Sequence, residues 1–269
     1  MLIFFAVLVG NRLLYTEIKL QDLQHSLSLR SSDKENPSGD NENCWEPMMN
    51  PLSDSSSPGD VKQPRAFSRY LNMGFPKAGS TSMYEAFRRA KFTASHWTCD
   101  ARNKLLCGEC MKDAKVKGIP LLESCGNFTV FAQMDYMGNN ETCIWPQIEY
   151  LDDLYKEAPD AMWLLPMRNV TDWIKSVNKW IDMRKRFQIC NFPHINFEGI
   201  DSESDETMKL FYCNHVKQIR HFVREHPSLT LFEFHIGDPD VGDRLSTMIP
   251  SFKASYWGQA NVNPIKPFL

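Results

Sequence analysis

The sequence has no apolar run long enough to cross a lipid bilayer. Its N-terminal run, residues 2–10, is much shorter than the about 20 residues that a membrane-spanning helix needs. The run also lacks the basic residues that open a standard signal peptide. The chain shows no internal repeat, and its net charge of −3 argues against a general nucleic-acid binder, because such proteins carry excess positive charge.

A Walker A motif is also absent. That motif needs Gly, four residues, and then Gly-Lys followed by Ser or Thr. Gly74 and Gly79 have this spacing, but Ser80 stands where the lysine belongs, and Lys77 lies inside the loop instead. The ordinary kinase or ATPase loop is therefore a poor match. A P-loop kinase-like phosphotransferase stays as the more distant alternative function, and it would bind ATP together with Mg²⁺.

The composition is nevertheless sufficient for a packed core. Hydrophobic residues make up 42% of the 269-residue chain and aromatic residues 12%, which allows one large domain or two small ones. Residues 31–64 break this pattern, because they are rich in Ser, Asp, Asn, Glu and Pro and poor in apolar side chains. We predict an apolar N-terminus over residues 1–24, a flexible stem over 25–65 and a folded domain over 66–269.

The most informative motif is Gly-Phe-Pro-Lys-Ala-Gly-Ser-Thr-Ser at residues 74–82. It follows a short apolar run at 70–73 and leads into apolar residues with helical spacing at 83–90. A glycine-bracketed turn at a helix N-terminus presents free backbone N–H groups and a positive dipole end to an anion. Lys77 adds a cation, and three hydroxyl side chains follow it. The pattern predicts a phosphate-binding loop; the alternative is a plain helix start capped by one of these hydroxyl groups.

A second strand-to-helix junction carries an arginine. Residues 161–167 form a mostly apolar run typical of a buried strand, and apolar spacing predicts a helix over 171–187. Arg168 lies between the two, and Ser176 lies within the predicted helix. Arginine binds phosphate through charge-assisted, geometrically selective hydrogen bonds. Taken singly, these would be a surface ion-pair residue and a solvated helix serine; in this order they indicate a second phosphate contact.

From about Ala66 to the C-terminus, the chain resembles the P-loop sulfotransferase family, and in particular its divergent sulfotransferase-like members. The resemblance rests on Pro-Lys-x-Gly-Ser-Thr-Ser at residues 76–82 together with Arg168 and Ser176. It implies a three-layer α/β fold with a central parallel sheet flanked by helices. It also implies an enzyme that moves a sulfuryl group from 3′-phosphoadenosine 5′-phosphosulfate (PAPS) to a hydroxyl or amine without a metal.

The resemblance implies a role for each matching residue. Lys77 would contact the bridging oxygen and stabilise the leaving phosphate, while Arg168 and Ser176 would bind the 3′-phosphate. The 5′-phosphate would be held by the loop residues Ala78, Gly79, Ser80, Thr81 and Ser82. Like phosphoryl transfer, sulfuryl transfer depends on in-line positioning and on neutralisation of developing charge. Residues 256–263, near the C-terminus, are a candidate for covering the nucleotide.

The acceptor must lose a proton, so we expect a general base. Asp135 ends a strand-like run at 128–134, close to where cytosolic members of the family carry a catalytic histidine. His96 ends another run at 91–95, where glycan-modifying members carry a catalytic glutamate. The carboxyl ends of parallel strands line the cleft of an open α/β sheet. Both positions therefore suit a base, and the choice between His96 and Asp135 stays open.

The chain has eight cysteines, an even number that is high for a cytosolic enzyme of this size. Four of them, Cys99, Cys107, Cys110 and Cys125, fall in one segment, and we predict disulfides that pin an insertion there. The alternative is a four-cysteine zinc site with His96 nearby. A zinc ribbon, however, normally has two Cys-x-x-Cys pairs, and this segment has one.

The N-terminal layout and the cysteines point to the same compartment. We interpret the chain as a type II membrane protein of the Golgi lumen, with a signal-anchor whose start is trimmed or misassigned; a buried N-terminal element and a cytoplasmic location are the alternatives. Asn127, Asn140 and Asn169 match the N-glycosylation pattern. We expect Asn169 to be unused, because a glycan there would lie against Arg168.

The sequence favours a sulfotransferase whose partners are the nucleotide cosubstrate and an acceptor. We favour a carbohydrate acceptor, with small molecules as the alternative, and we expect no nucleic-acid partner. Family membership predicts the residues that bind the cofactor, but it does not identify the acceptor. The first alternative function is a non-catalytic nucleotide-binding or scaffold protein on the same fold.

Overall fold

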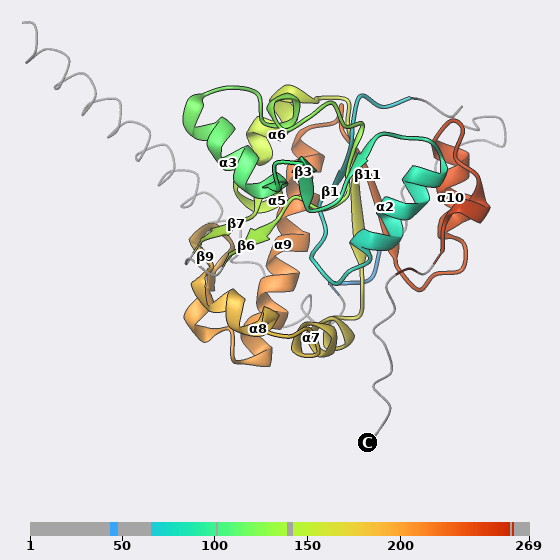
Figure 1. Cartoon of the computed structure of the whole chain (residues 1–269). Helices are drawn as coiled ribbons and strands as arrows, with labels where there is room; N and C mark the ends of the chain where they lie inside the picture. Colours follow the sequence, from blue (N-terminus) through green and yellow to red (C-terminus); the bar gives the residue numbers. More distant parts are fainter. Residues whose placement is uncertain (1–43, 48–65, 101, 139–141, 259, 261–269) are drawn as a thin grey trace, which may run out of the picture. The chain divides into compact units, whose positions relative to one another are not determined.

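The computed structural model, drawn in Figure 1, describes residues 44–47, 66–100, 102–138, 142–258 and 260. The predicted apolar N-terminus, residues 1–24, and all of the predicted stem except residues 44–47 lie outside this part of the chain. The domain boundaries therefore stay predictions. Within the described residues, no helix is both long enough and apolar enough to cross a membrane.

The elements of the described chain follow one another as short strands and helices. The strands are β1 (Tyr70–Asn72), β2 (Ala94–Ser95), β3 (Thr98–Asp100), β4 (Leu105–Leu106), β5 (Val130–Phe131), β6 (Tyr136–Met137), β7 (Cys143–Ile144), β8 (Met162–Met167), β9 (Asn191–Phe192), β10 (Phe197–Glu198) and β11 (Thr230–His235). The α-helices are α2 (Ser80–Arg89), α3 (Cys107–Lys117), α4 (Leu121–Ser124), α5 (Pro146–Glu149), α6 (Leu151–Glu157), α7 (Val170–Asn178), α8 (Met183–Arg186), α9 (Asp205–Glu225) and α10 (Val241–Met248). The 3₁₀ turns are η1 (Phe187–Ile189), η2 (Pro193–Ile195), η3 (Gly199–Asp201) and η4 (Ala254–Tyr256).

Five strands form the central sheet in the order β11-β8-β1-β5-β2. Every neighbouring pair in it is parallel. The chain first extends the sheet on one side of β1, with β2 and β5, and then on the other side, with β8 and β11. In open sheets of this kind, ligands bind at the carboxyl ends of the strands where the direction of winding changes. The predicted α/β class with a parallel sheet is confirmed, and its geometry points to the end of β1.

The sheet is covered on both faces, which produces three layers. Successive side chains of a strand point to opposite faces: Met162 and Leu164 of β8 pack with α2 and α10, whereas Trp163 and Leu165 pack with α6 and α9. Figure 1 shows α2 and α10 on one side of the sheet and α3, α6 and α9 on the other. Because β8 is buried on both faces, its sequence is an unbroken apolar run rather than an alternating one.

The helix predicted over residues 171–187 is shorter than expected. It ends as α7 at Asn178, and the chain turns so that the Trp180 N–H donates to the Val177 carbonyl. Ile181 has a φ of 33°, which a β-branched residue rarely adopts and which is incompatible with a continuing α-helix. A separate helix, α8, then begins at Met183. The apolar spacing continues across the break, and this misled the sequence-based prediction.

All eight cysteines form disulfides, which confirms the prediction made for the four in the segment after β2. The pairs are Cys44–Cys213, Cys99–Cys107, Cys110–Cys125 and Cys143–Cys190. Two of these bridges hold α3 in the segment that follows β2, where the insertion was expected. The zinc alternative is wrong, because the same two bridges use all four sulfur atoms of that segment.

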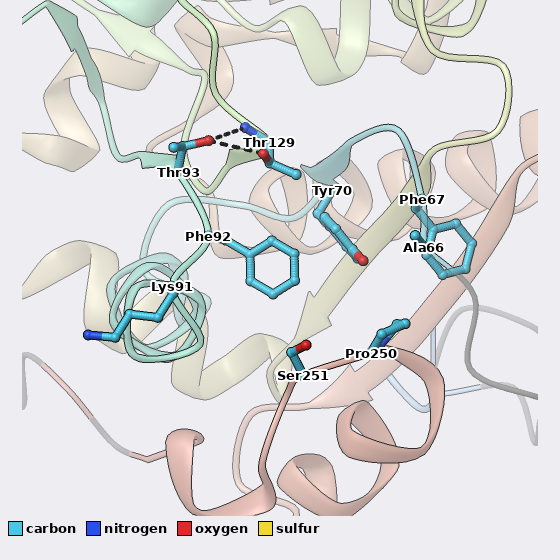
Figure 2. Close-up of a pocket in the computed structure, with 9 residues that line it drawn as sticks. All are labelled: Ala66, Phe67, Tyr70, Lys91, Phe92, Thr93, Thr129, Pro250 and Ser251. Atoms are coloured by element: carbon cyan, nitrogen blue, oxygen red, sulfur yellow. Dashed lines mark hydrogen bonds between the residues drawn. The ribbon is translucent and has the colours of Figure 1, made fainter.

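A cavity of about 420 Å³ opens at the amino ends of the strands. Tyr70 begins β1, Thr93 precedes β2 and Thr129 precedes β5, and Figure 2 shows all three around the cavity with Phe92 and Pro250. The hydroxyl groups of Thr93 and Thr129 are hydrogen-bonded to each other. This cavity therefore lies at the opposite end of the sheet from the loop that follows β1.

We predict that the long-range disulfide contributes more stability than the short one. Cys44 and Cys213 are 169 residues apart, whereas Cys99 and Cys107 are 8 apart. In the chain-entropy description of disulfides, removing the first should cost about 5 kcal/mol and removing the second about 2.5 kcal/mol. Urea unfolding of the double variants C44A/C213A and C99A/C107A measures both, and equal losses would contradict the prediction.

Candidate functional site

The loop after β1 lies close against the neighbouring strands. The buried Asn72 side chain donates to the Ala132 carbonyl at 2.6 Å and accepts from the Gly74 N–H at 2.8 Å. A Cβ added at Gly74 would lie 2.8 Å from Pro166 Cγ on β8. Trp173 of α7 donates its indole N–H to the Pro76 carbonyl at 2.9 Å. The loop is thereby held across the carboxyl ends of β1, β5 and β8.

Helix α2 starts without a side-chain cap and without an acidic residue in its first turn. Its N-cap is Gly79, whose φ of 94° is in the left-handed region that favours glycine. The first N–H groups of a helix have no intrahelical acceptor. Within the described chain, no group accepts a hydrogen bond from the backbone N–H of residues 79–82. The plain capped start is therefore wrong, and the N–H groups and positive dipole end of this helix are left without a partner in the described chain.

Two cations lie at the loop that leads into this helix. Lys77 has a φ of 68°, and Arg168, which follows β8, donates from Nη1 to the Lys77 carbonyl at 3.4 Å. The Lys77 ammonium lies 3.7 Å from the centroid of the Trp180 ring, a favourable cation–π contact. Burial and the nearby Arg168 lower the pKa of Lys77. Neither cation is paired with a carboxylate of the described chain, so both are available to an anionic ligand.

Ser176 is buried in α7. At a rise of about 1.5 Å per residue it lies about 9 Å along the axis from the start of that helix. Its side chain makes no hydrogen bond within the described chain. Asn169 caps α7 by accepting from the Thr171 and Asp172 N–H groups. Arg168 thus lies between β8 and α7 and Ser176 lies within α7, and no hydrogen bond of the described chain joins their side chains.

His96 lies at the carboxyl end of β2, beside the start of α2. Its Nε2 is 3.3 Å from Ser80 Oγ and 3.5 Å from Thr81 Oγ1. The imidazole packs against the Tyr84 ring at 5.3 Å between centroids. Burial lowers the pKa of His96, so its neutral form is favoured.

Asp135 is 4% exposed and therefore does not open toward solvent. Its Oδ2 accepts from Gln133 Nε2 at 3.2 Å, and the Gln147 side chain is a second hydrogen-bond partner. Burial raises the pKa of Asp135 to about 6. Gly108 of α3 covers this region, because an added Cβ there would lie 2.8 Å from the Met134 carbonyl oxygen. The two candidate bases thus have different environments, because His96 lies beside the uncapped start of α2 and Asp135 is enclosed.

A comparison with known protein families identifies the family to which the chain belongs. A family model of the sulfotransferase domain matches residues 69–242, which include both strand-to-helix junctions. The chain belongs to the sulfotransferase family. Neither the curated proteins nor the solved structures gave a significant match. The match confirms the resemblance seen in the sequence, and the roles of individual residues stay predictions.

The chain beyond the matched residues reaches the start of α2. The Ala260 N–H donates to Ser82 Oγ at 3.0 Å, and Trp257 packs edge-on against Phe234 of β11. Gln259 and residues 261–269 lie outside the described part of the chain. The predicted cover over the nucleotide is therefore anchored beside one of the predicted phosphate-binding hydroxyls.

Sequence reasoning missed two side chains of the sulfotransferase site. Gln133 accepts from the Ser80 hydroxyl at 3.2 Å, and its position at the carboxyl end of β5 was the available signal. Trp180 holds the Lys77 ammonium, but in sequence it looks like one more apolar residue of the predicted helix. Among the described residues, no group of three or more His, Cys, Asp and Glu side chains is arranged to hold a metal ion.

We predict that Gly79→Ala impairs both folding and anion binding. The new Cβ would lie 2.8 Å from Ile236 Cγ2 and would require a left-handed backbone, so we expect a loss of about 1–3 kcal/mol and weaker stabilisation by added phosphate. Gly118→Ala is the matched control, since it also has a positive φ but has open space around it. Urea unfolding with and without phosphate measures both, and a G79A protein with unchanged phosphate stabilisation would contradict the assignment of the loop.

Proposed function

We propose that this protein transfers a sulfuryl group from PAPS to a hydroxyl or amine of its acceptor. The single observation that carries the proposal is the pairing of an uncapped helix start with two cations, Lys77 and Arg168, that have no carboxylate partner in the described chain. Positive charge at the ends of two adjacent strands suits a ligand that has two separate phosphate groups. Membership of the sulfotransferase family supports the same reading.

The residues divide the binding work between the two junctions. The backbone N–H groups at the start of α2, with the hydroxyls of Thr81 and Ser82, would hold the 5′-phosphosulfate end. Ser80 would contribute its backbone N–H, because its hydroxyl donates to Gln133, and Ala78 and Gly79 would shape the loop. Arg168 and Ser176 would hold the 3′-phosphate. Lys77 would stay close to the bridging oxygen, where negative charge grows as the bond to sulfur breaks.

His96 is the base we favour. It lies beside the α2 start, its Nδ1 has no hydrogen-bond partner in the described chain, and burial favours its neutral form. In the proposed step the acceptor oxygen or nitrogen bonds to sulfur and the bond from sulfur to the bridging oxygen breaks. The electron pair stays on the 5′-phosphate beside Lys77, and the acceptor proton passes to His96. Asp135 is too enclosed to touch an acceptor.

A carbohydrate is the acceptor class that we favour. Trp97 directly follows His96 and is 42% exposed, and a flat apolar ring of this kind offers a surface for packing against a sugar. The four disulfides belong to oxidising compartments. This supports a luminal enzyme, and we propose a type II Golgi membrane protein held by the N-terminal segment.

Nucleotide binding provides the direct test. We expect Arg168→Ala to weaken binding of adenosine 3′,5′-bisphosphate by about 10- to 100-fold, because a charged hydrogen bond contributes about 1.5–3 kcal/mol. Binding of adenosine 5′-phosphate, which lacks the 3′-phosphate, should stay unchanged. Lys77→Met should lower PAPS turnover at least about 100-fold, the scale of losing one charge-stabilising donor. Lys117→Met, at the exposed end of α3, serves as the control.

Calorimetry and labelled-sulfate transfer to a panel of glycans and small alcohols measure these effects. Equal weakening for both nucleotides would contradict the role of Arg168. If the protein binds nucleotide, transfers sulfate to no acceptor and binds equally well as Lys77→Met, the non-catalytic alternative would be favoured over the enzyme. Mg²⁺-dependent binding of ATP in preference to PAPS would favour the kinase-like alternative instead.

Glycan mapping tests the proposed compartment. Asn127 is exposed just before β5, whereas Asn169 uses its side-chain oxygen to cap α7. In protein secreted or retained by eukaryotic cells, we expect a glycan on Asn127 and none on Asn169. Peptide mass spectrometry after enzymatic glycan removal detects both sites. A glycan on Asn169 would contradict the placement of the phosphate site, and a chain without any glycan would contradict the luminal location.

A further inference from the structure

We propose that Gln133 and Asp135 are positioning residues that hold His96, through Ser80, in the tautomer with its proton on Nε2. The inference deepens the proposed function, and only its effect on turnover rests on that function. The hydrogen bonds and the tautomer belong to the free protein and are testable without catalysis.

A continuous chain of hydrogen bonds joins the two residues that compete for the role of base. His96 Nε2 lies 3.3 Å from Ser80 Oγ, and Ser80 Oγ lies 3.2 Å from Gln133 Oε1. Gln133 Nε2 lies 3.2 Å from Asp135 Oδ2. These hydrogen bonds therefore run from His96 after β2 to Ser80 of α2. They continue to Gln133, which follows β5, and end at the Asp135 carboxylate.

The carboxylate decides the direction of this chain. An ionised Asp only accepts hydrogen bonds, so the Gln133 amide must turn its NH₂ toward Asp135 and its Oε1 toward Ser80. The Ser80 hydroxyl donates its one proton to that Oε1. Toward His96 it can then only accept, and His96 must donate from Nε2. The second hydroxyl near Nε2, Thr81 Oγ1 at 3.5 Å, can accept from the same proton.

The consequence concerns the other ring nitrogen. With the proton on Nε2, the lone pair of a neutral imidazole is on Nδ1, the atom that makes no hydrogen bond in the described chain. Nδ1 is then the atom that takes the acceptor proton. Above its pKa of about 6, Asp135 contributes as a charged acceptor that also has the Gln147 side chain as a hydrogen-bond partner, and its burial keeps it from competing as the base.

Nitrogen NMR of histidine in the nucleotide-free protein tests the tautomer directly. We expect His96, assigned by its loss in His96→Gln, to show a protonated Nε2 and an unprotonated Nδ1. Gln133→Met keeps the length of the side chain and removes both hydrogen bonds, so it should give a mixture of tautomers. Ser80→Ala interrupts the chain at another point and should give the same mixture, which covers the case in which Gln133→Met fails to fold. An unchanged tautomer in the folded variants would overturn the proposal.

Asp135→Asn is the matched variant that separates positioning from base catalysis. Asparagine can donate to Gln133 as well as accept from it and so no longer fixes the direction of the chain; we therefore expect a mixture of His96 tautomers, with turnover within about 10-fold of wild type. Removal of a general base costs about 10²–10⁴-fold, and a loss of that size with an intact His96 tautomer would make Asp135 the base.

Turnover of Gln133→Met completes the test. We expect kcat to fall about 10-fold while the affinity for adenosine 3′,5′-bisphosphate stays within about 3-fold, because the variant leaves the phosphate contacts in place. Equal changes in both quantities would indicate a merely structural role and would overturn the proposal. If wild-type protein shows the expected tautomer but transfers no sulfate, the proposed function fails while the hydrogen-bond chain stands.

Discussion

The close approach of the β1 loop to its neighbours is the constraint on which the site depends. Gly74 lies against Pro166 of β8, and Gly79 lies against Ile236 just after β11. Side chains at either position would push the loop away from the strand ends. The loop thus lies close to the strand ends, leads into the uncapped start of α2 and accepts a hydrogen bond from Arg168 through the Lys77 carbonyl.

The disulfide-bonded segment after β2 explains why the two candidate bases differ. Two bridges hold α3, and Gly108 lets that helix pack directly on the chain leading to Asp135. The carboxylate is thus enclosed and its pKa rises. His96 stays at the edge of the helix end, where hydroxyl groups meet its ring. One segment, held by two disulfides, thus encloses the first candidate base and leaves the second half-buried.

Much of the fold could be predicted because its signals are local. The unbroken apolar run of β8 and the glycine-bracketed loop after β1 predicted two parallel strands with helices behind them, and the structure confirms both. The predicted helix over 171–187 was wrong because Ile181 adopts a positive φ, which no local pattern announced. That turn presents Trp180 to Lys77, a contact between residues distant in the sequence.

The sequence by itself determined the family, the parallel α/β fold and the loop that would bind phosphate, because these rest on two short motifs, each with its spacing contained in one segment of the chain. The tertiary structure alone decided which side chains meet: the pairing of eight cysteines, the absence of a carboxylate beside Lys77 and Arg168 in the described chain, and the hydrogen-bond chain from His96 to Asp135. The physical reason is that charge pairing, burial and hydrogen-bond direction depend on neighbours from separate strands, and only the folded sheet brings those strand ends together.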